Sequence, residues 1–181
     1  LAQGQQAYWV CTMIEPNEEI AALSAEEAFD ILRRELPEFR VALLHGRMKG
    51  DEKVEVMRAF KAGEYQLLVA TTVVEVGFDV PNATQKFIEN AERLGLAQLH
   101  QLRGRVGRGS KASRCFLLFK PGVSQAGQHR LNALRQSQDG FYLAEQDLKL
   151  RGPGDILGTR QSGEQSFKIA DLSEHAHLMP R

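Results

Sequence analysis

Residues 41–71 have the sequence VALLHGRMKGDEKVEVMRAFKAGEYQLLVAT, in which two short apolar runs flank an amphipathic segment. The runs at 41–44 and 66–71 lack polar alternation, so we expect each to be a strand that is buried on both faces. Apolar residues recur at helical spacing over 51–62, and Gly63 follows as a C-terminal cap. A strand, a helix and a second strand in this order predict a parallel pair joined by a right-handed crossover.

The same alternation of strands and helices continues on both sides of this unit. Further strands are expected at 7–14, 86–88 and 115–119, and further helices at 24–36 and, more weakly, at 93–105. Ser24 and Glu27 form a capping box at the predicted start of the first helix. The pattern predicts an α/β fold for residues 1–120. This fold is a parallel sheet with helices on both faces, and it binds ligands at the carboxyl ends of its strands.

Pro121 and Gly122 mark a change in this pattern. Beyond them, two helices are expected at 124–135 and 141–150, joined by Asp139-Gly140 as a helical hairpin. A stretch rich in glycine and proline then begins at Arg151 and extends to Gly163. We therefore expect a second unit over residues 121–181, made of the hairpin, a loop and a C-terminal tail.

The composition of the 181 residues is that of an ordinary globular protein, because 43% of them are hydrophobic and 25% are charged. No apolar run approaches the roughly 20 residues needed to cross a bilayer, and residues 1–7 lack the features of a signal peptide. The histidines show no metal-ligand spacing, so no metal site is expected. Cys11 and Cys115 each lie in an apolar run, and we expect two buried free thiols in a reducing cytosol.

The formal net charge is zero, but the charges are unevenly distributed along the chain. No aspartate or glutamate occurs between Arg93 and Gln138. The same segment carries Arg93, Arg103, Arg105, Arg108, Lys111, Arg114, Lys120, Arg130 and Arg135. A neutral chain with one purely basic segment indicates a local anion site for nucleotide phosphate or a nucleic-acid backbone, unless the segment is only a solvated basic face.

Two arginines within the basic segment are spaced for phosphate chemistry. The run Gln101-Leu-Arg-Gly-Arg105-Val-Gly-Arg108 places them three apart and beside glycines, which let rigid guanidinium groups approach a ligand closely. Phosphoryl transfer uses such groups as arginine fingers. The alternative is a surface loop that binds RNA or no ligand. The chain has no GxxxxGK[ST] loop, so an ATPase site would need its phosphate cradle and Mg²⁺ ligands from elsewhere.

A second motif follows the strand at 66–71. That strand ends in Thr71 and Thr72, which suit either the cap of a following helix or a phosphate site built from backbone N–H groups. Gly77 permits a close approach of the backbone to a ligand, and Asp79 can accept hydrogen bonds from a ribose hydroxyl. An ordinary helix cap followed by a turn would use the same residue types.

Together and in this order, the two motifs resemble motifs V and VI of superfamily 2 helicases over roughly residues 7–119. The resemblance implies that the sheet is RecA-like and that Arg105 and Arg108 are the motif VI arginines, with Arg108 as the finger. It places Gln101 at a nucleotide site between two motor lobes. It further implies that Thr71 and Thr72 hold the DNA backbone and that Gly77 and Asp79 lie near the ribose.

Residues 88–109 are similar to two families within this superfamily, RecG and the transcription-repair coupling factor. Both continue into a translocation motif made of a helical hairpin and a loop. Three polar residues match the positions that carry this motif: Arg130, Arg151 and Gln161. The sequence RGPGDILGTRQSG at 151–163 is more similar to RecG, and the coupling factor is the alternative within the superfamily.

The resemblance implies the C-terminal motor lobe of an ATP-dependent helicase that remodels branched DNA, such as replication forks and Holliday junctions. ATP and Mg²⁺ would be held mainly by a preceding N-terminal motor lobe, which with a wedge domain would complete a monomeric protein without membrane attachment. The lobe alone is not expected to hydrolyse ATP. The alternative from another class is a stand-alone nucleic-acid-binding module. Such modules usually carry aromatic stacking residues, whereas the basic segment has only Phe116 and Phe119, both in a predicted strand.

Overall fold

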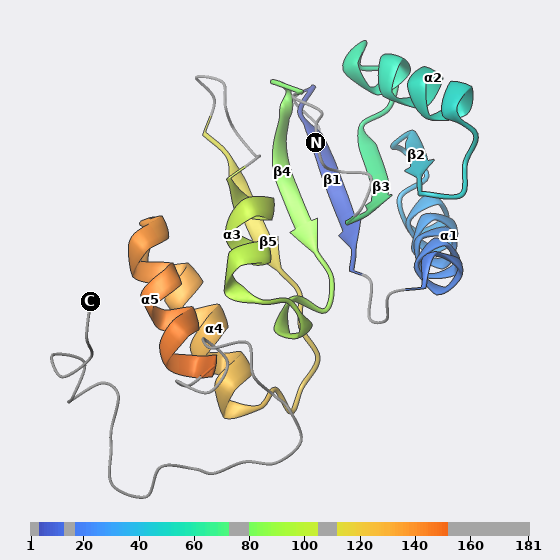
Figure 1. Cartoon of the computed structure of the whole chain (residues 1–181). Helices are drawn as coiled ribbons and strands as arrows, with labels where there is room; N and C mark the ends of the chain where they lie inside the picture. The colour runs from blue at the N-terminus through green and yellow to red at the C-terminus, as the bar shows by residue number, and fades with distance from the viewer. Residues whose placement is uncertain (1–3, 13–16, 73–79, 105–111, 152–181) are drawn as a thin grey trace, which may run out of the picture.

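The computed structural model describes residues 4–12, 17–72, 80–104 and 112–151, without the side chains of Glu18 and Arg151. Its described part contains a sheet with the strand order β2-β3-β1-β4-β5, and all neighbouring strands are parallel (Figure 1). The strands are β1 (Gln6–Cys11), β2 (Val41–Leu44), β3 (Leu67–Thr71), β4 (Ala83–Ile88) and β5 (Arg114–Leu117). The helices are α1 (Glu18–Glu35), α2 (Gly50–Lys61), the 3₁₀ turn η1 (Ala91–Arg93), α3 (Leu96–Arg103), α4 (Gln125–Gln136) and α5 (Gly140–Arg151).

Helices cover both faces of the sheet, which confirms the predicted α/β architecture. On one face, Leu68 and Ala70 of β3 belong to a core cluster that also includes residues of α2, α3, α4 and α5. On the other face, Leu67 and Val69 pack with residues of α1. The alternation follows from the pleat of a strand, which points successive side chains to opposite faces. All five residues of β3 are buried, as its unbroken apolar sequence predicts for a strand covered on both sides.

The start of α1 differs from the prediction. The helix begins at Glu18 rather than at Ser24, because Asn17 is its N-cap and accepts a hydrogen bond from the Glu19 backbone N–H at 2.9 Å. Ala21 and Ala22 are buried, so the first turns already contribute to packing. Ser24 therefore lies inside the helix, and the capping-box interpretation was wrong.

The segment between β4 and β5 is also more divided than the sequence suggested. Asn90 adopts a left-handed conformation with φ 46°, the η1 turn follows, and α3 begins only after Gly95. The last strand ends at Leu117 rather than at residue 119. It is an edge strand, which leaves Phe116 39% exposed and Cys115 half-buried, so the expectation of a buried thiol is correct for Cys11 only.

The C-terminal part of the described chain forms the predicted helical hairpin. Ser124 caps α4 by accepting a hydrogen bond from the Gly127 backbone N–H at 3.2 Å. The hairpin packs against α3 and η1 beside β4 and β5 (Figure 1). Leu131 and Leu134 of α4 and Leu143 of α5 belong to the same core cluster as Leu99 of α3. The hairpin and the helix before the paired arginines therefore share one apolar core.

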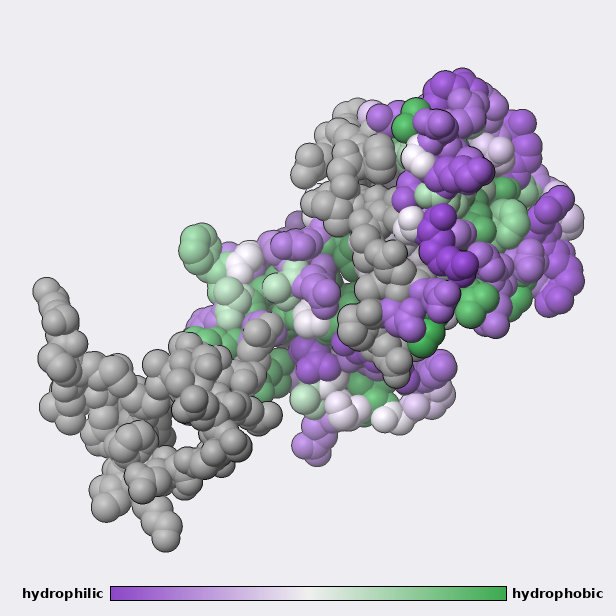
Figure 2. Space-filling model, turned by 45° about the vertical axis from the view of Figure 1, so that its right-hand side comes forward, coloured by the Kyte–Doolittle hydropathy of each residue, from purple (hydrophilic) through white to green (hydrophobic). Residues whose placement is uncertain are grey.

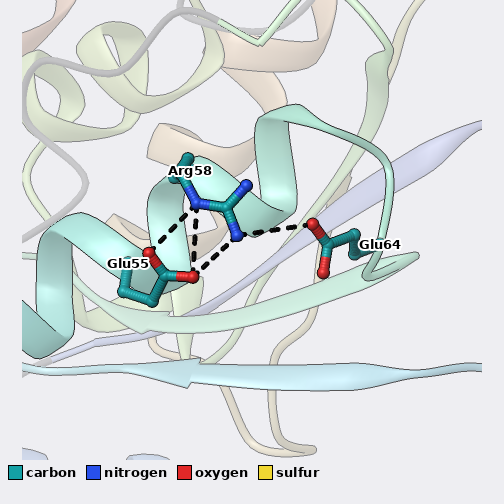
Figure 3. Close-up of polar contacts among 3 residues, drawn as sticks. All are labelled: Glu55, Arg58 and Glu64. Carbon is teal, nitrogen blue, oxygen red and sulfur yellow. Dashed lines mark hydrogen bonds and ion pairs between the residues drawn. The ribbon is translucent and has the colours of Figure 1, made fainter.

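Ion pairs on α2 connect this helix to the turn before β3. The Arg58 guanidinium lies 2.7 Å from the Glu55 carboxylate and 3.6 Å from that of Glu64 (Figure 3). The hydrogen bonds and charge of Arg58 hold the pKa of Glu55 below its usual value. Because all three side chains are well exposed, we expect this network to contribute little to stability.

The outer surface of α1 and α2 is mostly polar. Figure 2, with this side of the molecule turned forward, shows hydrophilic residues over most of it, with small apolar patches between them. The exposed apolar side chains of these helices include Ile20, Leu23, Ile31 and Val54. Within the described ranges, no helix has the length and apolar character required to cross a membrane.

Candidate functional site

Polar residues gather at the carboxyl ends of the parallel strands. Thr71 ends β3 and is only 2% exposed, and Thr72 follows it half-buried. Thr12 follows β1 and His45 follows β2, and both are buried. Ligands of open α/β sheets bind at this edge. The structure therefore places both threonines at the carboxyl edge of the sheet, and their role toward DNA stays a prediction.

Two buried atoms at this edge lack a hydrogen-bond partner among the described residues, the Thr12 hydroxyl and Nδ1 of His45. Nε2 of His45 lies 3.4 Å from the Glu26 carboxylate of α1. Buried polar atoms are almost always hydrogen-bonded in folded proteins. Because Nε2 of His45 faces a carboxylate, a neutral imidazole donates from Nε2 and leaves Nδ1 as an acceptor. The two atoms thus offer one hydroxyl and one acceptor nitrogen to a partner outside the described residues.

Glu89 adds a carboxylate after β4. It accepts a hydrogen bond from Nε1 of Trp9 at 2.7 Å and one from the Cys11 thiol. Burial raises the pKa of Cys11 far above its usual value, and the Glu89 charge and hydrogen bond act in the same direction. The Cys11 thiol is therefore a neutral packing group and not a nucleophile.

Five of the predicted site residues lie outside the described residues: Gly77, Asp79, Arg105, Arg108 and Gln161. Gln101 is described and lies exposed on α3, between the buried Leu99 and Leu102. Arg151 is the last residue of α5. The helix α3 leads in sequence directly into the segment that carries Arg105 and Arg108, so the contacts that hold α3 matter for any role of that segment.

Arg130 lies on the first hairpin helix, as the resemblance implied. Its Nη2 donates to the Glu92 carbonyl of η1 at 2.8 Å, and its buried Nε has no partner among the described residues. Gly127 lies one turn earlier, and a Cβ there would clash with Cγ1 of Val123 at 2.6 Å while only touching Cβ of Glu92 at 3.8 Å. Arg130 therefore connects the hairpin to η1, the turn before α3.

Sequence reasoning missed two cations that hold the C-terminal end of α3. Lys86 in β4 is fully buried, and its Nζ donates to the Leu102 carbonyl at 2.9 Å and lies 5.3 Å from the Tyr8 ring centroid. Arg103 donates to carbonyls of the hairpin. Burial lowers the pKa of Arg103, and Cys115 partly opposes this shift. A lysine directly before the apolar pair Phe87-Ile88 of the predicted strand, and an arginine directly before the Gly-Arg motif, were the signals available in the sequence.

An open groove of about 1070 Å³ lies between β5 and α4. Arg114 and Lys120 lie along it, and none of its described lining residues is an aspartate or glutamate. The basic segment of the sequence thus forms a positively charged surface beside the hairpin. Among the residues that the structure describes, no three histidine, cysteine, aspartate or glutamate side chains gather in a way that could hold a metal ion.

Comparisons with known proteins give a consistent assignment. The family model "helicase conserved C-terminal domain" matches residues 1–110, and the model "ATP-dependent DNA helicase RecG, domain 3, C-terminal" matches residues 137–180. The chain is 58% identical to ATP-dependent DNA helicase RecG of Escherichia coli K12 over 99% of its length. It is 48% identical to RecG of Bacillus subtilis over 95% of its length. It spans 26% and 25% of these relatives, so it corresponds to about a quarter of each.

Solved structures agree with the sequence relatives. A RecG bound to a three-way DNA junction aligns with 98% of this chain and 22% of that chain, at 45% identity and a TM-score of 0.68. Domain 2 of the DEAD-box helicase Mss116p aligns with 76% of this chain and 49% of that chain at 19% identity and a TM-score of 0.54, which shows the shared fold alone. The expected resemblance to RecG is confirmed, and the chain belongs to the family of helicase conserved C-terminal domains.

Proposed function

We propose that the chain is the C-terminal motor lobe of an ATP-dependent helicase that remodels branched DNA. The single observation that carries this proposal is the match of two parts of the chain, residues 1–110 and residues 137–180, to the helicase and RecG models respectively. The RecG in the similar solved structure is bound to a three-way DNA junction, which supports branched DNA as the substrate class. In this proposal, residues 1–120 form the RecA-like unit and residues 121–181 the hairpin, translocation loop and tail.

The residues of this lobe would complete an ATP site rather than form one alone. Arg105 and Arg108 follow α3 in sequence and would stabilise negative charge on the transferring phosphoryl group, with Gln101 at the same interlobe site. Gly77 and Asp79 would lie near the ribose. Mg²⁺ would assist when bound to the triphosphate. Because the sequence has no phosphate loop, we assign the phosphate cradle and the metal ligands mainly to an N-terminal lobe.

The DNA would contact the carboxyl edge of the sheet and the hairpin. Thr71 and Thr72 offer hydroxyl and backbone donors to a phosphate at the strand ends. Arg130 and Arg151 would transmit movement between the motor and the loop, and Gln161 would sense or grip the DNA. The remaining partners in this proposal are the N-terminal motor lobe and the wedge domain of the same polypeptide, in a monomeric protein of the bacterial cytoplasm.

The test uses the full-length protein that contains this chain, with a three-way DNA junction as substrate. DNA-stimulated ATP hydrolysis and junction unwinding are measured for wild type, Arg151→Ala and Gln161→Ala. We expect both variants to hydrolyse ATP and to lose unwinding, because the loop would no longer follow the motor. Parallel loss of both activities, or retention of both, would contradict the coupling role. DNA binding without DNA-stimulated ATP hydrolysis in the wild type would instead favour a stand-alone binding module.

A further inference from the structure

A single arginine side chain joins α3 to the C-terminal end of α4, the first helix of the hairpin. Arg103 is the last residue of α3, and its Nη1 donates to the Leu134 carbonyl at 2.5 Å and to the Ser137 carbonyl at 2.7 Å. These carbonyls lie at the C-terminal end of α4, where a helix leaves its last carbonyls without an internal donor. Arg103 therefore supplies, from another helix, the C-terminal cap of α4.

His100 extends this contact to α5. Nη2 of Arg103 lies 3.1 Å from Nδ1 of His100. A guanidinium can only donate, so Nδ1 must accept and the imidazole carries its proton on Nε2. A Cβ placed on Gly140, the first residue of α5, would lie only 3.3 Å from Nε2 of His100. The absence of a side chain at Gly140 thus lets the imidazole fit between Arg103 and the start of α5.

The same end of α3 is anchored to the sheet from its other side. Lys86 of β4 donates to the carbonyl of Leu102, the residue before Arg103, from a fully buried position. The last turn of α3 is consequently held by β4 on one side and by the hairpin on the other. Arg105 and Arg108 follow this turn by two and five residues in sequence.

We propose that Arg103 is a positioning residue that locks the hairpin to α3, so that displacement of the arginine-bearing segment moves the hairpin with it. This rests on the proposed function of the chain as a motor lobe. The planar guanidinium of Arg103 donates to two carbonyls at the end of α4 and to the imidazole of His100 on α3, and three hydrogen bonds from one rigid group make a stiff link. Coupling between a nucleotide site and a DNA-contacting element requires such a physical connection.

The decisive experiment compares Arg103→Ala, Arg103→Lys and Arg34→Ala in the full-length protein. Arg34 is the matched control, an exposed arginine on α1, which packs on the opposite face of the sheet. For Arg103→Ala we expect DNA-stimulated ATP turnover within about threefold of wild type, and about tenfold fewer base pairs unwound per ATP. Arg103→Lys should be intermediate, because an ammonium can reach one carbonyl but cannot reproduce the fork. Arg34→Ala should match the wild type in both activities.

Three outcomes would overturn the proposal. If ATP turnover and unwinding fall in proportion in both Arg103 variants, the side chain is only a structural cap of α4. If Arg103→Ala unwinds as many base pairs per ATP as wild type, the link does not transmit movement. A third measurement does not depend on enzymatic activity. It is the rate of amide hydrogen exchange of residues 137–143 in the 181-residue chain. Exchange should accelerate in Arg103→Ala but not in Arg34→Ala, and equal exchange would show that the contact does not hold the hairpin.

The failure of the proposed function is a different result. It would appear as a wild-type full-length protein that neither hydrolyses ATP with branched DNA nor unwinds it. The exchange measurement would still report whether Arg103 holds the hairpin, because it depends only on the contacts within this chain.

Discussion

Replacement of Arg130 by methionine removes the hydrogen bond that connects α4 to η1 in the described part of the chain. Methionine keeps the apolar length of the side chain but removes the donor to the Glu92 carbonyl, which lies 2.8 Å from Nη2. Loss of a hydrogen bond from a charged donor costs about 1.5–3 kcal/mol. The change also removes the buried Nε that has no described partner, which returns roughly 1 kcal/mol. The net free energy of unfolding should therefore fall by about 1 kcal/mol.

For a chain of this length, such a loss lowers Tm by roughly 2–4 °C. Thermal unfolding of the 181-residue chain measures it, with Arg135→Met as the control. Arg135 lies on the same helix and is exposed, so its replacement should change stability by less than about 0.5 kcal/mol. A Tm for Arg130→Met equal to that of Arg135→Met, or higher, would refute the inference that Arg130 holds the hairpin on η1.

Three further predictions concern the chemistry of the chain. The purified 181-residue chain should show no DNA-stimulated ATP hydrolysis, because it has no phosphate loop, and turnover free of contaminating ATPase would contradict this. In the full-length protein, Arg108→Lys should reduce ATP turnover by about 10³-fold with little change in DNA binding, since an ammonium lacks the planar fork; near-normal turnover would exclude a finger role. At pH 8, a thiol reagent should modify the half-buried Cys115 faster than Cys11, because burial and Glu89 raise the pKa of the Cys11 thiol. The two rates are measured separately in the Cys11→Ala chain, which keeps Cys115, and in the Cys115→Ala chain, which keeps Cys11. Faster modification of Cys11 would refute the buried Cys11–Glu89 contact.

The sequence predicted the sheet well because its strands are buried on both faces. β3 is apolar throughout and fully buried, so its pattern has a single physical explanation. The start of α1 was harder to predict, because Asn17 and Ser24 are both good caps and only packing decides between them. Cys115 was predicted to be buried, yet β5 lies at an edge of the sheet, and burial at an edge depends on neighbours that composition does not reveal.

The sequence likewise located some residues of the candidate site and missed others. Thr71, Thr72 and Arg130 were placed by motif, and the structure positions them at the strand ends and on the hairpin. Their roles stay predictions, as do those of Gly77, Asp79, Arg105, Arg108 and Gln161. Lys86 and Arg103 are visible in the sequence, but their contacts could not be predicted from it, because their partners are backbone carbonyls, which every residue type contributes.

Backbone carbonyl partners also explain how the hairpin can be tightly held and still move with the motor. Apolar contacts such as those of Leu131 and Leu134 with α3 are non-directional, so they would tolerate small sliding of one helix on another. The hydrogen bonds of Arg103 and Arg130 are directional and fix where the hairpin lies along α3 and η1. If the hairpin moves with α3, as we propose, the second kind of contact is the one that would carry the displacement. We therefore expect the two arginines to add positional precision to the apolar core that the hairpin already shares with α3.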